Sequence, residues 1–265
     1  AMRNIAPAQG DYHQMVRGGG HGDYRPIVLA PASVQEAIDL TVLAFDLADQ
    51  YRTIAVVLAD GSIGQMMEPA ELPAMQPLRS TMPQWAVTGE PDRERRLLTS
   101  IYLKPEDEEV TNMRLLERWL TIQREEVRYA EYFLDDAEII LVGFGTAGRV
   151  ALSAVRQARE QGIKVGLFRP ITLSPFPEDQ LKKLAQQAES LLVVEMNSGQ
   201  MLDDVRLAVR GEVPVEFYGR MGGVVPFPDE ILSEIIRVAE GKAPTADEHA
   251  RQAWLERLVS LRGAQ

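Results

Sequence analysis

The stretch EIILVGFGTAG at residues 138–148 decides the fold of the second half of this chain. Its apolar run predicts a buried strand, its glycines predict a tight turn, and the residues after them have the pattern of a helix that ends near Gly162. Strand and helix patterns then alternate, which predicts a doubly wound α/β domain with right-handed crossovers. The expected strands are 164–168, 191–195 and 213–218, and the expected helices are 150–161, 177–188, 201–209 and 227–240.

The spacing of Gly143, Gly145 and Gly148 matches G-x-G-x-x-G, the fingerprint of dinucleotide-binding domains. Such glycines let amides at a helix N-terminus approach a pyrophosphate. The fingerprint also requires an acidic residue at the end of the next strand, but here that strand ends in Arg169-Pro170, so Arg169 would have to take a 2′-phosphate instead. We therefore favour close helix–strand packing, or another anion, over a dinucleotide site.

The first half of the chain carries two short apolar runs, at 27–30 and 53–59, that predict strands. Between them, Ser33 and Glu36 form a capping-box pair that predicts the start of a helix. Uniformly apolar strands on either side of a helix are typical of a parallel sheet covered on both faces. The residues expected on one face of this helix are Ala37, Leu40, Thr41, Ala44, Leu47 and Ala48.

Prolines recur between residues 67 and 104 and predict an extended connector. Pro105 and the acidic residues after it suit the start of a long helix, which we expect to run to about Phe133. At the other end of the sequence, residues 245–261 predict an amphipathic helix that carries Trp254, Leu255, Leu258 and Val259.

Composition excludes several classes of protein. The 265 residues contain no cysteine and 3 histidines, which excludes disulfide scaffolds and any iron–sulfur cluster held by the chain's own cysteines, and we expect no metal site in this chain. The net charge of −11 disfavours nucleic acid as a partner. The sequence has neither an apolar run of about 18 residues nor the pattern of a secretory signal, so we expect no membrane span and a cytoplasmic protein.

A second glycine cluster, GGGHGD at residues 18–23, lies in a loop-like N-terminal segment. Its His21 and Asp23 are able to hold a charged group or to donate a proton, and the alternative is a role in a turn or an interface. Arg17 and Arg25 flank the cluster and add positive charge to an acidic protein. The cluster is therefore a candidate site for a charged ligand.

Short strings distributed over nearly the whole chain complete the sequence evidence. In the first half they are NIAPAQGDY at 4–12, GGGHGDYR at 18–25, LAPASVQE at 29–36, LADG at 58–61 and GQMMEP at 64–69. In the second half they are EVRY at 126–129, GFGT at 143–146, RP at 169–170 with PFP at 175–177, EMNSGQ at 195–200 and YGRMGG at 218–223. Taken together, the strings resemble the alpha subunits of 2-oxoacid:ferredoxin oxidoreductases, and most of all the branched-chain type that acts on 2-oxoisovalerate.

The resemblance implies an α/β chain in two parts. The first part, at 1–80, is the later portion of an incomplete, pyrimidine-type, three-layer domain that binds thiamine diphosphate, and a connector with a long helix follows at 81–134. A transketolase C-terminal-like doubly wound α/β domain is implied at 135–241, and a terminal helix at 242–265.

The reaction implied is oxidative decarboxylation of a branched-chain 2-oxoacid to an acyl-coenzyme A and CO₂, with electrons passed to ferredoxin. Thiamine diphosphate with Mg²⁺ is expected to be shared with or held by a partner subunit, and iron–sulfur clusters are expected only in partners. The implied partners are beta, gamma and delta-type ferredoxin-like subunits. We also expect the isolated chain to associate with itself.

The resemblance also identifies site candidates. The residues that match the loop facing thiamine and substrate in the family are Asn4, Ile5, Gln9, Asp11, His21 and Asp23. The family's activating glutamate is absent from this sequence, so no catalytic residue is assigned, and we expect an N-terminally truncated form of the subunit. Two alternatives remain open, namely a non-catalytic fragment that only folds and associates, and a dinucleotide-binding protein.

Overall fold

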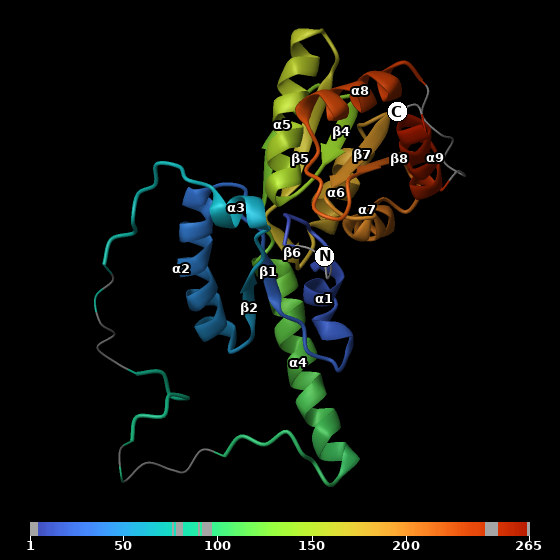
Figure 1. Ribbon diagram of the computed structural model, residues 1–265. Helices are drawn as coiled ribbons and strands as arrows, with labels where there is room; N and C mark the ends of the chain where they lie inside the picture. Colours follow the sequence, from blue (N-terminus) through green and yellow to red (C-terminus); the bar gives the residue numbers. More distant parts are fainter. Residues whose placement is uncertain are drawn as a thin grey trace.

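The chain forms two sheets joined by one long helix, as the computed structural model shows (Figure 1). The structure describes residues 5–75, 77, 82–89, 91, 97–241 and 249–263. Within this part, no helix has the length and apolar character needed to cross a membrane. The elements are α1 (Tyr12–Val16), a 3-10 turn (Gly18–Gly20), β1 (Ile27–Leu29), α2 (Val34–Tyr51), β2 (Ala55–Val57), α3 (Gly61–Gln65), α4 (Pro105–Glu125), β3 (Tyr129–Tyr132), β4 (Ile139–Val142), α5 (Gly145–Glu160), β5 (Val165–Pro170), β6 (Thr172–Ser174), α6 (Glu178–Ala185), β7 (Ser190–Glu195), α7 (Gln200–Val209), β8 (Val215–Gly219), α8 (Pro228–Ala239) and α9 (Ala250–Gly263).

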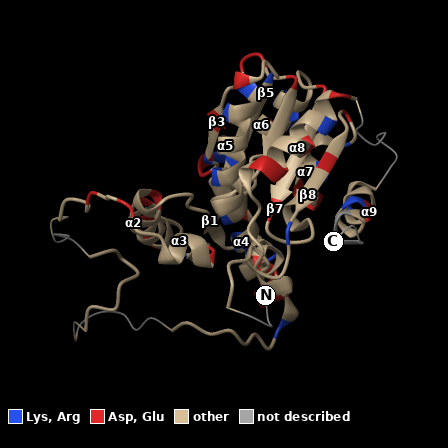
Figure 2. Ribbon diagram, turned by 45° about the horizontal axis from the view of Figure 1, so that its top comes forward, with Lys and Arg blue, Asp and Glu red and all other residues tan. Residues whose placement is uncertain are grey.

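The larger sheet has the strand order β3-β5-β4-β7-β8, in which β4, β5, β7 and β8 run parallel. Helices α5 and α8 pack on each other, as do α6 and α7, so helices cover both faces of the sheet. Acidic and basic residues are interspersed along these outer helices (Figure 2). The predicted doubly wound domain is confirmed.

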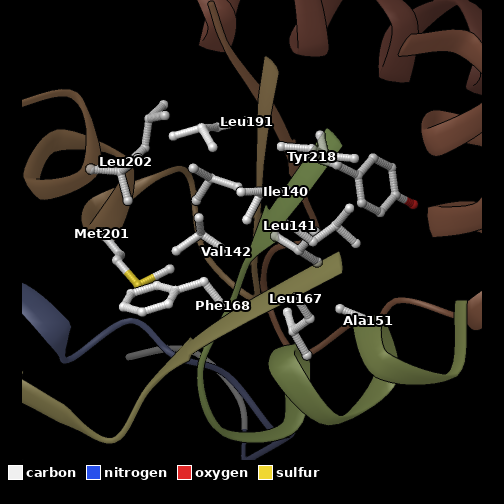
Figure 3. Close-up of a cluster of buried hydrophobic side chains, with 14 of the residues drawn as sticks. Ile140, Leu141, Val142, Ala151, Leu167, Phe168, Leu191, Met201, Leu202 and Tyr218 are labelled. Carbon is white, nitrogen blue, oxygen red and sulfur yellow. The ribbon is translucent and has the colours of Figure 1, made fainter. Parts of the chain in front are cut away.

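The core of this domain lies on both faces of the sheet, where the strands pack against α5 and α8 and against α6 and α7. Figure 3 shows buried side chains of Ile140, Val142 and Phe168 together with Met201 and Leu202 of α7. Strands β4, β5 and β7 are buried along their whole length, and each contains an apolar run, which is complete in β4, interrupted by Gly166 in β5 and flanked by Ser190 and Glu195 in β7. This is why their positions are visible from the sequence alone.

The smaller sheet has the order β2-β1-β6. Strands β1 and β2 pair in parallel with Ile27 opposite Ala55, which confirms the predicted parallel pair. The third strand, β6, comes from the second half of the chain and pairs antiparallel with β1. No strand was expected there, because a segment of 3 residues carries no periodicity of its own.

Helix α2 begins as expected at Ser33, whose Oγ accepts a hydrogen bond from the Glu36 amide at 3.1 Å. The Glu36 carboxylate, however, accepts from the amide of Ala32 at 2.8 Å, so only half of the capping box forms. Its other contact is with Arg169, which reaches it from β5. On the expected inner face of α2, Leu40, Ala44 and Leu47 are buried, whereas Thr41 is exposed and donates to the carbonyl of Ala37 within its own helix.

Helix α4 ends at Glu125, and the expectation of a helix up to Phe133 is wrong. Residues Tyr129–Tyr132 form β3 instead, an antiparallel edge strand that pairs with β5. Their alternating exposure is that of a strand with one face on the core. Phe133, at a φ of 57°, turns the chain away from the sheet. Pairing with a strand distant in sequence outweighs the helical spacing of the apolar residues.

Two further expectations concern the connector and the C-terminal helix, and only the first agrees fully with the structure. The described residues between Met66 and Lys104 contain no helix or strand, in agreement with an extended connector. Helix α9 packs Trp254 on Phe217 with ring centroids 5.0 Å apart, but Leu255 and Val259 are exposed, so the expected apolar face is too wide. Adjacent positions on a helix differ by about 100°, and only the row at Trp254 and Leu258 faces the core.

Candidate functional site

From β4 the chain passes to β5 on one side, and later to β7 and β8 on the other side, so the strand order reverses between β4 and β7. Doubly wound domains bind ligands in the crevice at the carboxyl ends of the two strands where the order reverses. Here the N-terminal segment closes that crevice. The backbone amide of Gln9 donates to the carbonyl of Met196 at 3.1 Å, and Asn197 Nδ2 donates to the carbonyl of Gln9 at 2.8 Å. The crevice is thus an internal contact between the two halves of the chain.

Gln9 is the central residue of this contact. Its Nε2 donates to the carbonyl of Phe144 after β4 at 2.8 Å, and its Oε1 accepts from the amide of Met196 after β7 at 3.0 Å. The side chain is buried, so both ends of its amide are satisfied within the chain. Gln9 therefore orients the loop that follows it.

The carboxyl end of β7 also carries a buried carboxylate. Glu195 is fully buried, and its two oxygens accept from the amides of Met201 and Leu202 at 2.9 Å each, at the start of α7. Burial raises the pKa of Glu195 to about 7, against the opposing effect of these hydrogen bonds. The group ties the end of β7 to α7 beside the segment that Gln9 anchors.

The G-x-G-x-x-G turn holds no space for a pyrophosphate. A Cβ on Gly145 would lie 3.0 Å from Gln9 Nε2, and one on Gly148 would lie 2.6 Å from the carbonyl oxygen of Gly143. The carboxylate of Asp60 sits at the amino end of α5, where it accepts from Thr146 Oγ1 at 2.8 Å. This internal carboxylate takes the place that an anionic ligand would occupy at a helix N-terminus.

Arg169 is likewise committed within the chain. Its guanidinium is almost fully buried and makes a two-pronged contact with the Glu36 carboxylate, at 2.9 and 2.6 Å. It therefore does not serve a 2′-phosphate. The dinucleotide alternative is overturned, and close packing is the reason for these glycines.

The other glycine cluster lies at the surface. Gly18, Gly19, Gly20 and Gly22 all have positive φ, between 60° and 75°, a conformation that side chains of L-residues disfavour. A Cβ on Gly18 would lie 2.5 Å from the carbonyl oxygen of Tyr24. We call residues 17–25 the glycine loop. Gly18 itself is buried, whereas Gly19, Gly20 and Gly22 are exposed and leave their backbone open to a ligand or a partner.

The six site residues expected from the resemblance are not gathered at one point. Asn4 lies outside the described residues. Gln9 is buried in the contact described above, whereas Ile5, Asp11, His21 and Asp23 are exposed. The structure therefore divides the described candidates into Gln9, which orients the segment from inside, and four residues that lie at the surface.

Both ends of the glycine loop are fixed. Arg17 Nη2 contacts Asp204 Oδ1 at 2.6 Å, and Tyr12 donates to Asp204 Oδ2 at 2.7 Å. Burial and this carboxylate raise the pKa of Tyr12 well above its usual value, so the phenol remains a donor. At the other end, the Arg25 guanidinium stacks over Trp119 of α4 at 5.7 Å.

A pocket of 350 Å³ lies beside these anchors. Its lining includes Arg17 and Arg25 of the loop, Trp119 of α4, Ser174 at the end of β6, and Glu178 and Asp204 of the second domain. Burial, and then Asp204, raise the pKa of Glu178. The sequence carries no local signal for Asp204 or Glu178, because each meets the loop across more than half of the chain. For Tyr12 the sequence could have predicted a hydrogen-bond partner, though not its identity, because a buried phenol hydroxyl needs one.

The comparisons with known proteins agree in two regions. A family model described as "Pyruvate flavodoxin/ferredoxin oxidoreductase, thiamine diP-bdg" matches residues 1–135. One described as "Pyruvate:ferredoxin oxidoreductase core domain II" matches residues 137–234.

Similar sequences and structures point the same way. The ketoisovalerate oxidoreductase subunit VorB of Methanothermobacter thermautotrophicus is 49% identical over 90% of this chain and 67% of its own length. The 2-oxoglutarate synthase subunit KorA of Methanothermobacter marburgensis is 34% identical over 86% of this chain and 68% of its own length. A solved 2-oxoglutarate:ferredoxin oxidoreductase from Magnetococcus marinus, with 2-oxoglutarate, coenzyme A and succinyl-CoA bound, has a TM-score of 0.70 at 19% identity. It shares the fold over 88% of this chain, which spans 45% of the solved chain.

Proposed function

The chain belongs to the 2-oxoacid:ferredoxin oxidoreductases, and we propose that it works as the alpha subunit of an enzyme that oxidatively decarboxylates a branched-chain 2-oxoacid. The observation that carries the proposal is the 49% identity to a ketoisovalerate oxidoreductase subunit over 90% of the chain, against 34% for a 2-oxoglutarate synthase subunit. Family and fold class confirm the resemblance carried by the sequence strings.

The overall reaction takes a 2-oxoacid anion, coenzyme A and two oxidised ferredoxins to an acyl-coenzyme A, CO₂, two reduced ferredoxins and a proton. When bound, thiamine diphosphate supplies the carbanion chemistry that cleaves the bond to the carboxylate. The residues of this chain orient and surround that cofactor.

The glycine loop fits one wall of such a site, because Gly19, Gly20 and Gly22 are exposed and carry no side chain that would cover their peptide groups. We assign Asn4, Ile5, Asp11, His21 and Asp23 to the face toward thiamine and substrate. Gln9 positions this segment through its bonds to the ends of β4 and β7.

The metal and the clusters belong to other subunits in this proposal. The described residues contain no group of three His, Cys, Asp or Glu side chains placed to hold a metal ion, and the sequence has no cysteine. Mg²⁺, the diphosphate and the iron–sulfur clusters are therefore assigned to beta, gamma and delta-type ferredoxin-like partners, with the assembled enzyme in the cytoplasm. The division of the chain at residues 80, 134 and 241 is part of the same proposal.

The test is coexpression with the neighbouring subunits, followed by an assay of viologen reduction. Reduction that depends on 2-oxoisovalerate and coenzyme A, and that is faster than with 2-oxoglutarate, supports the proposal. Failure of the chain to assemble with any partner subunit, together with no heat of binding for thiamine diphosphate and Mg²⁺, favours a non-catalytic fragment instead.

A further inference from the structure

Helix α7 of the second domain holds the start of the glycine loop. Its residue Asp204 is 7% exposed, and its two carboxylate oxygens contact two different residues of the N-terminal segment. Oδ2 accepts from the Tyr12 hydroxyl at 2.7 Å, and Oδ1 accepts from Arg17 Nη2 at 2.6 Å. A carboxylate this buried needs such partners, because burial of an unpaired charge costs free energy. Asp204 therefore connects the second domain to the residue that begins the glycine loop.

The position of Asp204 is itself fixed by the end of β7. The side chain of Asn197 accepts from the amide of Gln200 at 2.9 Å, and Glu195 accepts from the amides of the next two residues, so the first turn of α7 is capped. Gln200 and Asp204 are one turn apart on the same face of α7, and Gln200 Oε1 accepts from the amide of His13 in α1 at 2.8 Å. Helix α1 packs on α7 accordingly (Figure 1). Helix α7 is thus a fixed support for the segment that leads into the loop.

The glycine loop depends on its ends for its placement. The three glycines after Arg17 all have positive φ, and glycine has the widest choice of backbone conformations, so these residues do not direct the chain by themselves. The loop instead closes on itself, because a Cβ on Gly18 would lie 2.5 Å from the carbonyl oxygen of Tyr24. The amide of Gly20 donates to the carbonyl of Arg17 at 2.9 Å, which ties the turn to its first residue. The contact between Arg17 and Asp204 is therefore placed to set where the whole loop lies.

We propose that Asp204 is a positioning residue for the reaction, which acts through Arg17 to hold the glycine loop at the face toward thiamine and substrate. The effect on rate rests on the proposed function, whereas the hold on the loop is a property of this chain alone. Asp204→Asn is the variant that isolates the contact. The new side chain keeps the size of the old one and still accepts from Tyr12, but it lacks the charge with which Arg17 pairs.

The first test is the rate at which trypsin cleaves the full chain after Arg17. Trypsin takes the arginine side chain into its own acidic pocket, so the pair with Asp204 protects this bond. The other arginine of the loop, Arg25, is followed by Pro26 and is not a cleavage site. Asp204→Asn is expected to speed cleavage after Arg17 about tenfold or more, relative to cleavage after Lys183 within α6 in the same digest. An unchanged ratio would overturn the proposal.

The second test is kcat/KM for 2-oxoisovalerate in the coexpressed complex. Asp204→Asn and Arg17→Gln are each expected to lower it about tenfold, and the double variant is expected to lose no more than either alone, because both break one contact. Arg17→Lys keeps a cation for this single-pronged contact and is expected to lose less than about threefold. The matched control for both tests is Glu216→Gln, which alters a buried carboxylate paired with Arg237 at 2.8 Å. It is expected to change neither the cleavage ratio nor kcat/KM.

The two tests separate this inference from the proposed function. A wild-type complex without activity on any 2-oxoacid refutes the proposed function, and the cleavage ratio still decides whether Asp204 holds the loop. An active wild-type complex with full activity in both Asp204→Asn and Arg17→Gln refutes the positioning role. Additive losses in the double variant, or equal losses in Glu216→Gln, refute it as well.

Discussion

The two glycine clusters of this protein use the same residue for opposite purposes. Gly143, Gly145 and Gly148 lie in the interior, where an added Cβ would meet backbone or buried polar atoms. In the glycine loop, Gly20 and Gly22 adopt positive φ at the surface, and Gly20 has nothing within 4 Å of an added Cβ. The cluster with the familiar binding motif is thus closed by the chain itself, and the one without a motif is open.

The largest effect is expected from Gly148→Ala. Its Cβ would approach the carbonyl oxygen of Gly143 to 2.6 Å, and neither backbone is able to move without shifting α5 from β4. We expect a loss of about 3 kcal/mol or more in the free energy of unfolding, measured in urea. Gly20→Ala, the matched control in the glycine loop, is expected to cost about 1 kcal/mol from its positive φ alone. Equal losses would show that the two clusters do not differ.

The pH dependence of stability tests the interior region, where Glu195 is buried at the end of β7. Burial raises the pKa of Glu195 to about 7, so the folded chain keeps this proton at a pH where the unfolded chain has lost it. The contribution of the Glu195 proton to the free energy of unfolding is therefore full at acid pH and declines as pH rises through about 5 to 7, by as much as about 3 kcal/mol. Glu195→Gln is expected to lack this decline in denaturant titrations at several pH values. A variant with the same slope as the wild type would contradict the assignment.

The junction between the two sheets is expected to be the next most sensitive. Glu36→Gln leaves the buried Arg169 guanidinium without its counter-charge and is expected to lower the free energy of unfolding by about 2 kcal/mol. Glu138→Gln removes a pair with Lys164 at the surface and is expected to cost less than about 1 kcal/mol. Thermal unfolding of both variants measures the difference, and a reversed order would refute the role of Arg169.

No effect at all is expected from dinucleotides. Because Asp60 occupies the amino end of α5, NAD or NADP at millimolar concentration is expected to leave the melting temperature unchanged. Thiamine diphosphate with Mg²⁺ on the coexpressed complex is the positive control. A clear shift with either dinucleotide would reopen the alternative that the packing of Gly145 excludes.

The features that can be predicted from the sequence are those encoded within a single short segment of the chain. Strands such as Ile139–Val142 and the Ser33 cap lie in single short windows, so they are predictable. Strand β3 forms only because β5 lies beside it, and helical spacing is misleading there. The role of Gln9 depends on Phe144 and Met196, far away in sequence, so the site could be predicted as a loop but not as a loop anchored in the crevice of the second domain.

The central claim is that the glycine loop, and not the motif at α5, faces the reaction. The direct measurement is kcat/KM for 2-oxoisovalerate in the coexpressed complex carrying His21→Ala, beside His249→Ala, which alters another exposed histidine, directly before α9. The account predicts at least a tenfold loss (~1.4 kcal/mol) for His21→Ala with assembly intact, and no loss for His249→Ala. Equal activity of the two variants would contradict it.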